Sequence, residues 1–202
     1  MIAEILTMIA LTPVIEIVPE KFDTLHEEAF ILYSGIQSPT QLMDIGFELG
    51  GKVELLLAHP YSIRFGIDYS RANTIEPFAP EGYRESWTLG LDLVSYRGRD
   101  GMMGYLGVGV TYGVNSFKLN RRAADSLFLA DGINSVSISD KAGYRIFMGL
   151  KFDQRFLAEV SYYYTTPDFV YQSDLGPSSF SQGRDDGALS VGRISLGYII
   201  PF

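Results

Sequence analysis

Residues 188–202 read ALSVGRISLGYIIPF, and large apolar side chains alternate here with small or charged ones. Arg193, Ser195 and Gly197 fall on one face of this segment. The opposite face carries Ile194, Leu196, Tyr198, Ile200 and Phe202. A period of two residues is that of a β-strand whose two faces meet different environments. The segment is therefore predicted to be a β-strand.

The same alternation recurs upstream. The segments that show it are residues 28–37, 43–57, 61–70, 85–97, 102–119, 141–152 and 156–165. Together with the final segment they make eight strands, joined by connections that are alternately tight and longer. An even number of strands lets the first pair with the last and leaves no open sheet edge. The prediction is an all-β, eight-stranded antiparallel up-and-down barrel over residues 28–202, preceded by a short N-terminal segment.

Composition agrees with this prediction and excludes several classes. The chain has 202 residues with 21 Gly, 13 Tyr and 13 Phe, a balance typical of β-rich proteins. Its net charge of −8, without a dense basic cluster, argues against a nucleic-acid partner. There is no Cys, so disulfides and thiolate metal sites are excluded.

The N-terminal segment, residues 1–27, is interpreted separately. Ile5 to Leu11 has the apolarity of a secretory leader, but Glu4 stands where such leaders carry positive charge. The segment is either a residual leader or an amphipathic or periplasmic segment that Pro13 interrupts. A terminus without a specific role is the third interpretation.

The direction in which the two faces point follows from glycine and aromatic residues. Most strand glycines lie on the polar face, as expected for the narrow interior of an eight-stranded barrel. On the apolar face, aromatic residues lie near the strand ends, as in the girdles of membrane barrels. The predicted girdle is Tyr61, Tyr69, Trp87, Tyr164 and Tyr198. The barrel is therefore predicted to span a membrane, with its apolar face toward lipid.

This orientation places charged side chains inside the barrel. The predicted lumen charge network is Glu48, Lys52, Glu54, Arg64, Asp68, Asp92, Arg145, Lys151, Glu159 and Arg193, with Asp44 as a further inward charge. Hairpin geometry predicts that Glu54 lies opposite Arg64, Lys52 diagonal to Asp68, and Lys151 near Glu159. These side chains either form a salt-bridged plug or line a narrow hydrated path.

No catalytic or metal site is expected. His59 lies in a predicted turn and His26 precedes the first strand, and neither has a recognisable catalytic partner in sequence. Asp185-Asp186 and the pair Asp125 and Asp131 are interpreted as solvated loop charges rather than cation ligands. In the loop 120–140, Leu127-Phe128-Leu129 is an apolar cluster that either binds a partner or folds over the barrel mouth.

The spacing of Ser195, Gly197, Ile200 and Phe202 resembles the C-terminal signal strand of bacterial outer-membrane barrels. Over residues 28–202 the chain resembles the small eight-stranded barrels of Gram-negative bacteria, the group that contains the OmpA transmembrane domain, OmpX and OmpW. The resemblance implies an outer-membrane location, contact with the lipid bilayer and lipopolysaccharide, and recognition by the outer-membrane assembly machinery. No cofactor is expected.

Three hypotheses of function remain. The first is a non-enzymatic membrane scaffold or surface protein that binds a partner through the loops 120–140 or 169–186. The second is a narrow channel for small or hydrophobic solutes. The third is a lipid-modifying enzyme of the outer membrane.

Overall fold

The computed structural model describes residues 28–39, 44–74, 82–99, 101–120, 133–153, 155–166, 169–173 and 190–202. Several features singled out in the sequence lie outside these ranges. They are the N-terminal segment 1–27 with His26, the Leu127-Phe128-Leu129 cluster, and the loop residues Asp125, Asp131, Asp185 and Asp186. Within the described ranges, no helix has the length and apolarity to cross a membrane.

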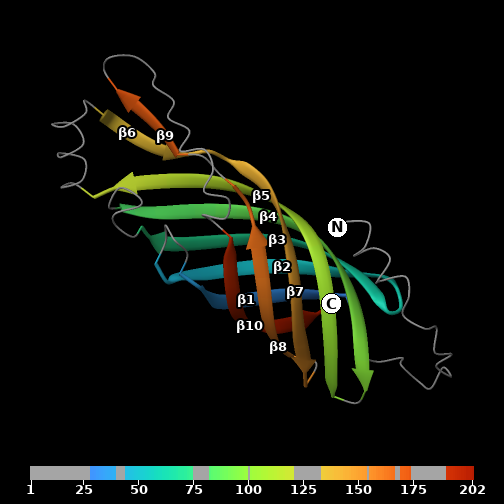
Figure 1. Ribbon diagram of the computed structural model, residues 1–202. Coiled ribbons are helices and arrows are strands. Elements are labelled where there is room, and N and C mark those ends of the chain that lie inside the picture. The colour runs from blue at the N-terminus through green and yellow to red at the C-terminus, as the bar shows by residue number, and fades with distance from the viewer. Residues whose placement is uncertain are drawn as a thin grey trace.

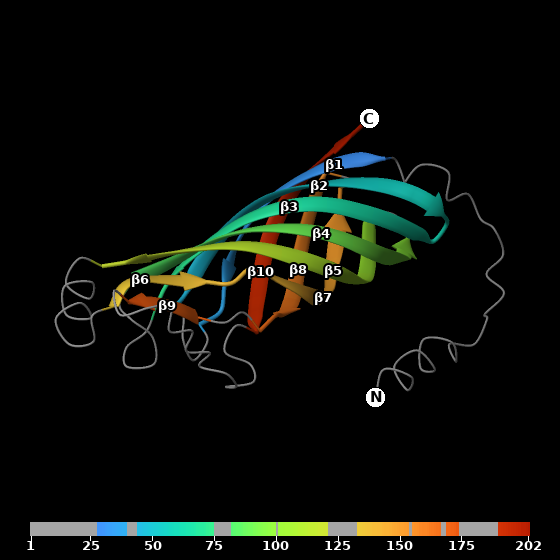
Figure 2. The ribbon, with the colours of Figure 1, turned by 90° about the horizontal axis from the view of Figure 1, so that it is seen from above.

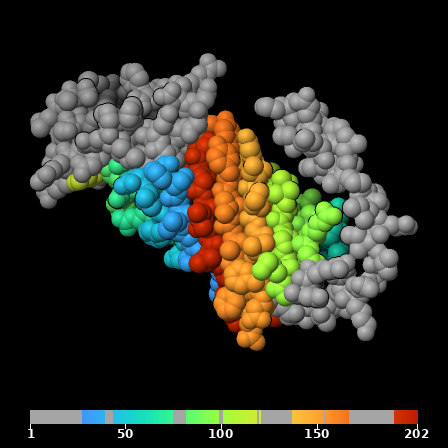
Figure 3. All heavy atoms as spheres, turned by 60° about the horizontal axis from the view of Figure 1, so that its bottom comes forward, coloured from blue at the N-terminus to red at the C-terminus, as the bar shows by residue number. Residues whose placement is uncertain are grey.

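Eight strands form one closed antiparallel barrel (Figure 1). Their bounds are β1 Ala29–Gln37, β2 Gly46–Ala58, β3 Tyr61–Asn73, β4 Gly82–Arg99, β5 Met102–Leu119, β7 Lys141–Phe152, β8 Phe156–Tyr164 and β10 Val191–Pro201. Around the barrel the order is β1, β10, β8, β7, β5, β4, β3, β2 and back to β1. Figure 3 shows β10 (red) packed between β1 (blue) and β8 (orange), where the sheet closes. The predicted fold class is confirmed.

The two ends of the barrel differ. At the turn end, consecutive strands join through the short connections 59–60, 100–101 and 153–155, and β1 begins and β10 ends there. At the loop end, the connections are the longer segments 38–45, 74–81, 120–140 and 165–190. Short turns at one end and long loops at the other are typical of transmembrane barrels.

Two short strands correct the sequence prediction at the loop end. β6 (Ile133–Ile138) and β9 (Phe169–Ser173) pair antiparallel in a separate two-stranded sheet. They lie inside the segments 120–140 and 169–186, which were predicted to be loops without strands. These strands have 6 and 5 residues and belong to distant parts of the chain. They flank β7 and β8 in the chain, and their pairing extends that hairpin in a nearly unchanged register.

One wall of the barrel is taller than the other. β5 pairs with β4 as far as Leu119, but with β7 only as far as Gly113. β3 follows β4 to the pair Asn73–Tyr83. The wall of β3, β4 and β5 therefore continues past β7 at the loop end, and β6 contacts β5 there (Figure 2).

The inner and outer faces have opposite chemistry. Leu196 is 63% exposed on the outer face, whereas Arg64 is fully buried on the inner face. Glycines make this inner packing compatible with large side chains: a Cβ at Gly107 would collide with the Phe147 ring, and one at Gly50 with the Tyr33 ring. An eight-stranded barrel has room for side chains only when some inner positions are small.

Candidate functional site: the lumen of the barrel

The charged residues predicted for the lumen are all found there. All ten are buried: Glu48, Lys52, Glu54, Arg64, Asp68, Asp92, Arg145, Lys151, Glu159 and Arg193. Five are basic and five are acidic, so their charges balance. Asp44 differs from its prediction, because it precedes β2 as an exposed residue and its side chain accepts a hydrogen bond from the Ile45 N–H at 2.7 Å.

The turn-end network is centred on Arg64 of β3. It consists of Lys52, Glu54, Arg64, Tyr96, Tyr105, Lys151 and Glu159. Arg64 Nε donates to Glu54 at 2.8 Å, Nη1 to Glu159 at 3.1 Å and Nη2 to the Tyr96 hydroxyl at 2.7 Å. One guanidinium group thus joins β2, β4 and β8 across the lumen.

The remaining groups of this network complete the pairing of its two carboxylates. Lys151 Nζ lies 3.0 Å from Glu54, and Lys52 Nζ lies 3.0 Å from Glu159. The Tyr96 hydroxyl donates to Glu54 at 2.5 Å, and the Tyr105 hydroxyl donates to Glu159 at 3.0 Å. Each carboxylate therefore has two cationic partners and a hydroxyl. Buried charges are tolerated when they are paired in this way.

The strand registers place Lys52 diagonal to Asp68 and Lys151 diagonal to Glu159, as hairpin geometry predicted, but the ion pairs of these two lysines lie elsewhere. Lys52 pairs with Glu159 rather than with Asp68, and Lys151 pairs with Glu54 rather than with Glu159. Glu54 and Arg64 do lie opposite each other in the β2–β3 register and form an ion pair. In a closed barrel a long side chain can reach the opposite wall as easily as the neighbouring strand. Spacing in the sequence predicts contacts between neighbouring strands but not contacts across the lumen.

The loop-end network lies further along the lumen. It consists of Glu48, Asp68, Asp92, Arg145, Tyr163 and Arg193. Arg145 of β7 forms a two-nitrogen contact with Asp92 and lies 3.5 Å from Asp68. Arg193 of β10 donates to Glu48 at 2.6 Å, and its guanidinium carbon lies 3.6 Å from the centre of the Tyr163 ring.

A sixth basic side chain lies nearer the loop end and was not predicted as part of the site. Arg84 of β4 is 8% exposed, and its Nε and Nη2 both donate to the Asn115 side-chain oxygen, at 2.9 and 2.6 Å. Among the described residues Arg84 has no carboxylate partner. The alternation predicted a strand over residues 85–97, but β4 begins at Gly82 and includes Arg84. Arg84 lies two residues before Ser86 and therefore on the same inner face, which was the available indication in the sequence.

Apolar side chains close the turn end of the lumen. One cluster is Ala29, Ile31, Tyr33, Leu157 and Ile199, and the other is Val94, Tyr96, Met103, Tyr105 and Phe147. These clusters are also absent from the predicted site. The sequence did contain an indication of them in consecutive apolar residues such as Ile199-Ile200 and Phe156-Leu157. Only one residue of each pair can face outward, so the other must face the lumen.

The position of His59 and the grouping of the acidic residues bear on catalysis and on metal binding. His59 is exposed in the turn between β2 and β3. Within the described ranges, no three residues of His, Asp or Glu are grouped so that they could hold a metal ion.

The proposed assembly signal lies on β10 with its residues on both faces. Ser195 is buried and Gly197 faces the lumen beside Leu157, whereas Ile200 and Phe202 are exposed on the outer surface. Pro201 is the last residue of β10, a position where its missing N–H costs no ladder hydrogen bond. The Phe202 N–H donates to the Glu28 carbonyl at 3.0 Å.

Aromatic side chains on the outer face gather in two groups. Near the turn end, Phe156 lies 5.5 Å from Tyr198, and Tyr61 is exposed at the start of β3. Toward the loop end, Tyr69 lies 5.1 Å from Trp87, and Tyr164 stacks on Tyr144 at 4.9 Å. Tyr61 and Tyr69 lie eight residues apart on β3, which corresponds to roughly 26 Å along a strand. Strand tilt reduces this to about 20 Å, close to the height of an apolar membrane band.

The outer face becomes charged directly beyond the Tyr69–Trp87 pair. Glu85 accepts a hydrogen bond from the Tyr69 hydroxyl at 3.0 Å and pairs with Lys118 at 3.2 Å. The hydrogen bond between the two side chains lowers the pKa of Glu85 and raises that of Lys118. Arg71 lies over the Tyr83 ring at 4.0 Å. This change from apolar to charged marks the boundary of the apolar belt.

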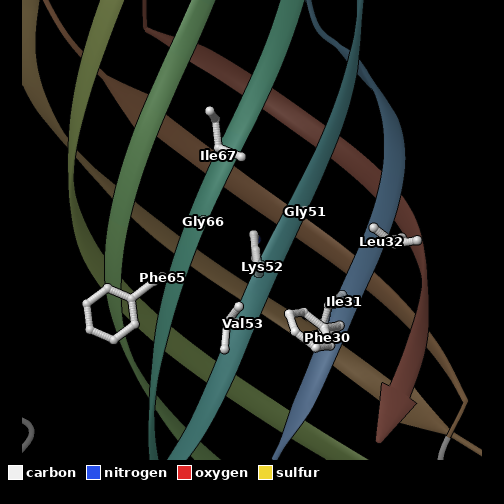
Figure 4. Close-up of a pocket in the computed structure, with 9 residues that line it drawn as sticks. All are labelled: Phe30, Ile31, Leu32, Gly51, Lys52, Val53, Phe65, Gly66 and Ile67. Atoms are coloured by element: carbon white, nitrogen blue, oxygen red, sulfur yellow. The ribbon is translucent and has the colours of Figure 1, made fainter. Parts of the chain in front are cut away.

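A depression in the outer surface crosses β1, β2 and β3 (Figure 4). Its volume is about 360 Å³, and it is lined by Phe30, Ile31, Leu32, Gly51, Lys52, Val53, Phe65, Gly66 and Ile67. The depression arises because Gly51 has no side chain between Leu32 and Ile67, its partners in the register. Lys52 contributes little, since its side chain is buried inside the barrel. The depression is therefore part of the apolar belt and offers no polar chemistry.

Similar solved structures are outer-membrane proteins. The outer membrane protein OprG from Pseudomonas aeruginosa matches with a TM-score of 0.56 and 16% identity, over 87% of this chain and 97% of OprG. Neisserial surface protein A matches with a TM-score of 0.51 and 14% identity, over 87% and 96%. The outer membrane protein AlkL matches with a TM-score of 0.52 and 12% identity, over 92% and 96%.

This chain has the fold of the small bacterial outer-membrane β-barrels. The resemblance expected from its strand pattern is thus confirmed. No protein-family model matches the sequence, and no curated protein is significantly similar to it. At identities below 20% the structural matches concern the fold alone.

Proposed function

We propose that this chain is a non-enzymatic outer-membrane protein whose closed barrel is a scaffold for the segments at its loop end. The observation that carries the proposal is the Arg64 contact set, which joins β2, β3, β4 and β8 across the lumen. Arg145 makes a second crossing, from β7 to β3 and β4. The apolar clusters at the turn end add a third obstruction.

The tall wall of β3, β4 and β5 supports a role at the loop end. It carries strands beyond the apolar belt and contacts the β6–β9 sheet through β6. Short turns of membrane barrels face the periplasm, so the loop end would face the outside of the cell. A protein partner would then bind the segments 120–140 or 169–186.

Lipid contacts follow from the outer face. The apolar belt would contact the bilayer, and the cations Arg71 and Lys118 lie just beyond the Tyr69–Trp87 pair. Phosphate groups of lipopolysaccharide would lie at this level of the outer leaflet, where they can pair with these cations. Recognition of β10 by the assembly machinery is part of the same proposal.

Conductance in planar lipid bilayers tests the closed lumen. Folded protein, verified by its heat-dependent gel mobility, should insert without producing regular single-channel steps. Liposomes that contain the protein should not swell faster in glycerol than empty liposomes. Regular openings or accelerated swelling would favour a narrow channel and reject the scaffold.

The lipid-modifying enzyme is tested separately. His59 lies at the turn end, away from the outer leaflet in this orientation. His59→Ala and His26→Ala should leave the lipid A profile of expressing cells equal to that of wild type. A modified lipid A that appears with wild-type protein and disappears with either variant would show that the protein is an enzyme.

A further inference from the structure

The depression on the outer face exists because one position lacks a side chain. Gly51 of β2 lies between Leu32 of β1 and Ile67 of β3, as Figure 4 shows. A Cβ built on Gly51 would make only ordinary contacts, with a Leu32 methyl group at 3.6 Å and the Ile31 carbonyl oxygen at 3.9 Å. Packing within the barrel therefore does not require glycine here. The effect of the glycine is to keep a depression of about 360 Å³ open on the outer face.

The depression lies nearer the loop-end edge of the apolar belt. On β3, Ile67 is two residues from Tyr69 at that edge and six residues from Tyr61 at the opposite edge. Arg71, the first outward charge of β3 beyond Tyr69, is four residues from Ile67, or roughly 13 Å along the strand. Strand tilt reduces this to a depth of about 10 Å, which is less than half of the ~30 Å thickness of the hydrocarbon core. An acyl chain that starts beside Arg71 therefore reaches the depression.

The walls of the depression suit hydrocarbon. They are formed by Phe30, Leu32, Phe65 and Ile67, all of which are exposed on the outer face. Water in such a place would find too few hydrogen-bond partners, and an empty gap would forfeit dispersion contacts. Contact within a membrane is decided by close packing, because lipid tails are as apolar as the side chains. A flexible, unbranched acyl chain provides that packing.

Arg71 supplies a polar group above the depression. Its guanidinium carbon lies 4.0 Å from the centre of the Tyr83 ring, and Lys118 Nζ lies 5.6 Å from the same centre. Lys118 is paired with Glu85, whereas Arg71 has no carboxylate within 4 Å among the described residues. Two cations and one carboxylate around this ring leave a net positive charge. A guanidinium group binds phosphate through two parallel hydrogen bonds, so this end of the site suits a phosphate group.

We propose that the outer face of β1, β2 and β3 binds one molecule of lipid A, with a phosphate group on Arg71 and one acyl chain in the depression at Gly51. This inference rests on the proposed function, which places the loop end at the outer leaflet. Lipid A fits both parts of the site because it is a phosphorylated glycolipid with several acyl chains. Phospholipids also carry a phosphate group and acyl chains, and the experiment distinguishes the two.

The test is native mass spectrometry of the full chain, folded in detergent and titrated with diphosphoryl lipid A. Wild type should bind one molecule saturably, and more tightly than it binds phosphatidylglycerol or lipid A stripped of its phosphates. Heat-dependent gel mobility confirms that each variant is folded. Binding of phosphatidylglycerol as tight as that of lipid A would overturn the assignment to lipid A.

Two pairs of variants match the two parts of the site. Arg71→Gln should weaken lipid A binding about tenfold or more, whereas Arg97→Gln, which removes an exposed cation near the turn end of β4, should not change it. Gly51→Leu fills the depression and should weaken binding severalfold. Its control is Gly104→Leu on the outer face of β5, where a Cβ would meet only the Arg97 carbonyl oxygen at 3.4 Å and a Leu150 methyl group at 3.9 Å. If Gly51→Leu does not fold, Gly51→Val replaces it with the same expected loss.

A double-mutant cycle tests the contact between Arg71 and phosphate. Removal of the phosphates from lipid A and Arg71→Gln should have effects that do not add, because each removes the same interaction. Additive effects would overturn the phosphate contact. Equal affinities of wild type and the Gly51 variant would overturn the acyl-chain site. Neither result depends on whether the barrel conducts ions, so this proposal and the closed scaffold can fail separately.

Discussion

The two halves of the lumen solve the problem of buried charge differently. In the turn-end network, both carboxylates have two cations and a hydroxyl each, and apolar clusters lie beneath them. In the loop-end half, Arg84 lacks a carboxylate and several buried polar atoms lack partners among the described residues. The first half is complete as folded, whereas the second leaves buried polar atoms without partners among the described side chains.

Because of this difference, deletions in the turn-end network should cost more stability than deletions in the loop-end half. A fully paired network contributes to holding opposite walls together, and any deletion removes a partner from a buried charge. Unused donors contribute nothing to the folded state until a ligand or water occupies them. The variants below therefore should affect the two halves to different degrees.

The largest effect is expected for Arg64→Ala. This change removes three buried hydrogen bonds of a charged group and leaves a cavity at the centre of the network, so it should lower the free energy of unfolding by about 3–5 kcal/mol. Urea unfolding in lipid vesicles, followed by Trp87 fluorescence, measures it. Arg97→Ala is the control, because Arg97 is exposed on β4 near the same end. Equal losses in both variants would show that the network is not what stabilises the turn-end half.

Two Tyr→Phe variants compare how much a bonded and an unpartnered hydroxyl group contribute to stability. Tyr96→Phe removes a hydrogen bond to Glu54 and one from Arg64, and should cost about 1–3 kcal/mol. Tyr33→Phe removes a hydroxyl that has no partner among the described groups and should change the unfolding free energy little. The same urea assay measures both. A Tyr33→Phe loss as large as that of Tyr96→Phe would mean that a bound water or ion already uses the Tyr33 hydroxyl.

The smallest effect is expected for Arg84→Met in buffer free of carboxylates and phosphates. It replaces an unpaired buried cation with an apolar side chain, so the unfolding free energy should stay unchanged or rise by about 1 kcal/mol. A clear loss of stability in the variant without added anion would show that Arg84 is already satisfied.

Much of the barrel was predictable because strand periodicity is a local property. The alternation from Lys141 to Phe152, for example, identified β7 with its observed bounds. The apolar outer face followed from the glycines on the other face. The strands β6 and β9 were not predictable, since each is short and gains its stability from a distant partner.

Contacts in the lumen were predictable only within single hairpins. Glu54 and Arg64 face each other across one hairpin, and their register is readable from the spacing around the turn at residues 59–60. The contacts Lys52–Glu159 and Lys151–Glu54 connect opposite walls, and no spacing in the sequence encodes them. Likewise, only the folded structure shows that Arg84 bonds to the neutral Asn115 and has no carboxylate partner among the described residues.

The sequence by itself determined which side chains face lipid and which face inward, because a strand alternates its faces with a fixed period of two. It also indicated that charges of both signs would be enclosed in the narrow interior of an eight-stranded barrel. Only the tertiary structure decided which charge meets which, because closure of β1 on β10 sets the distances across the lumen. That closure satisfies the turn-end half and leaves unused donors in the loop-end half.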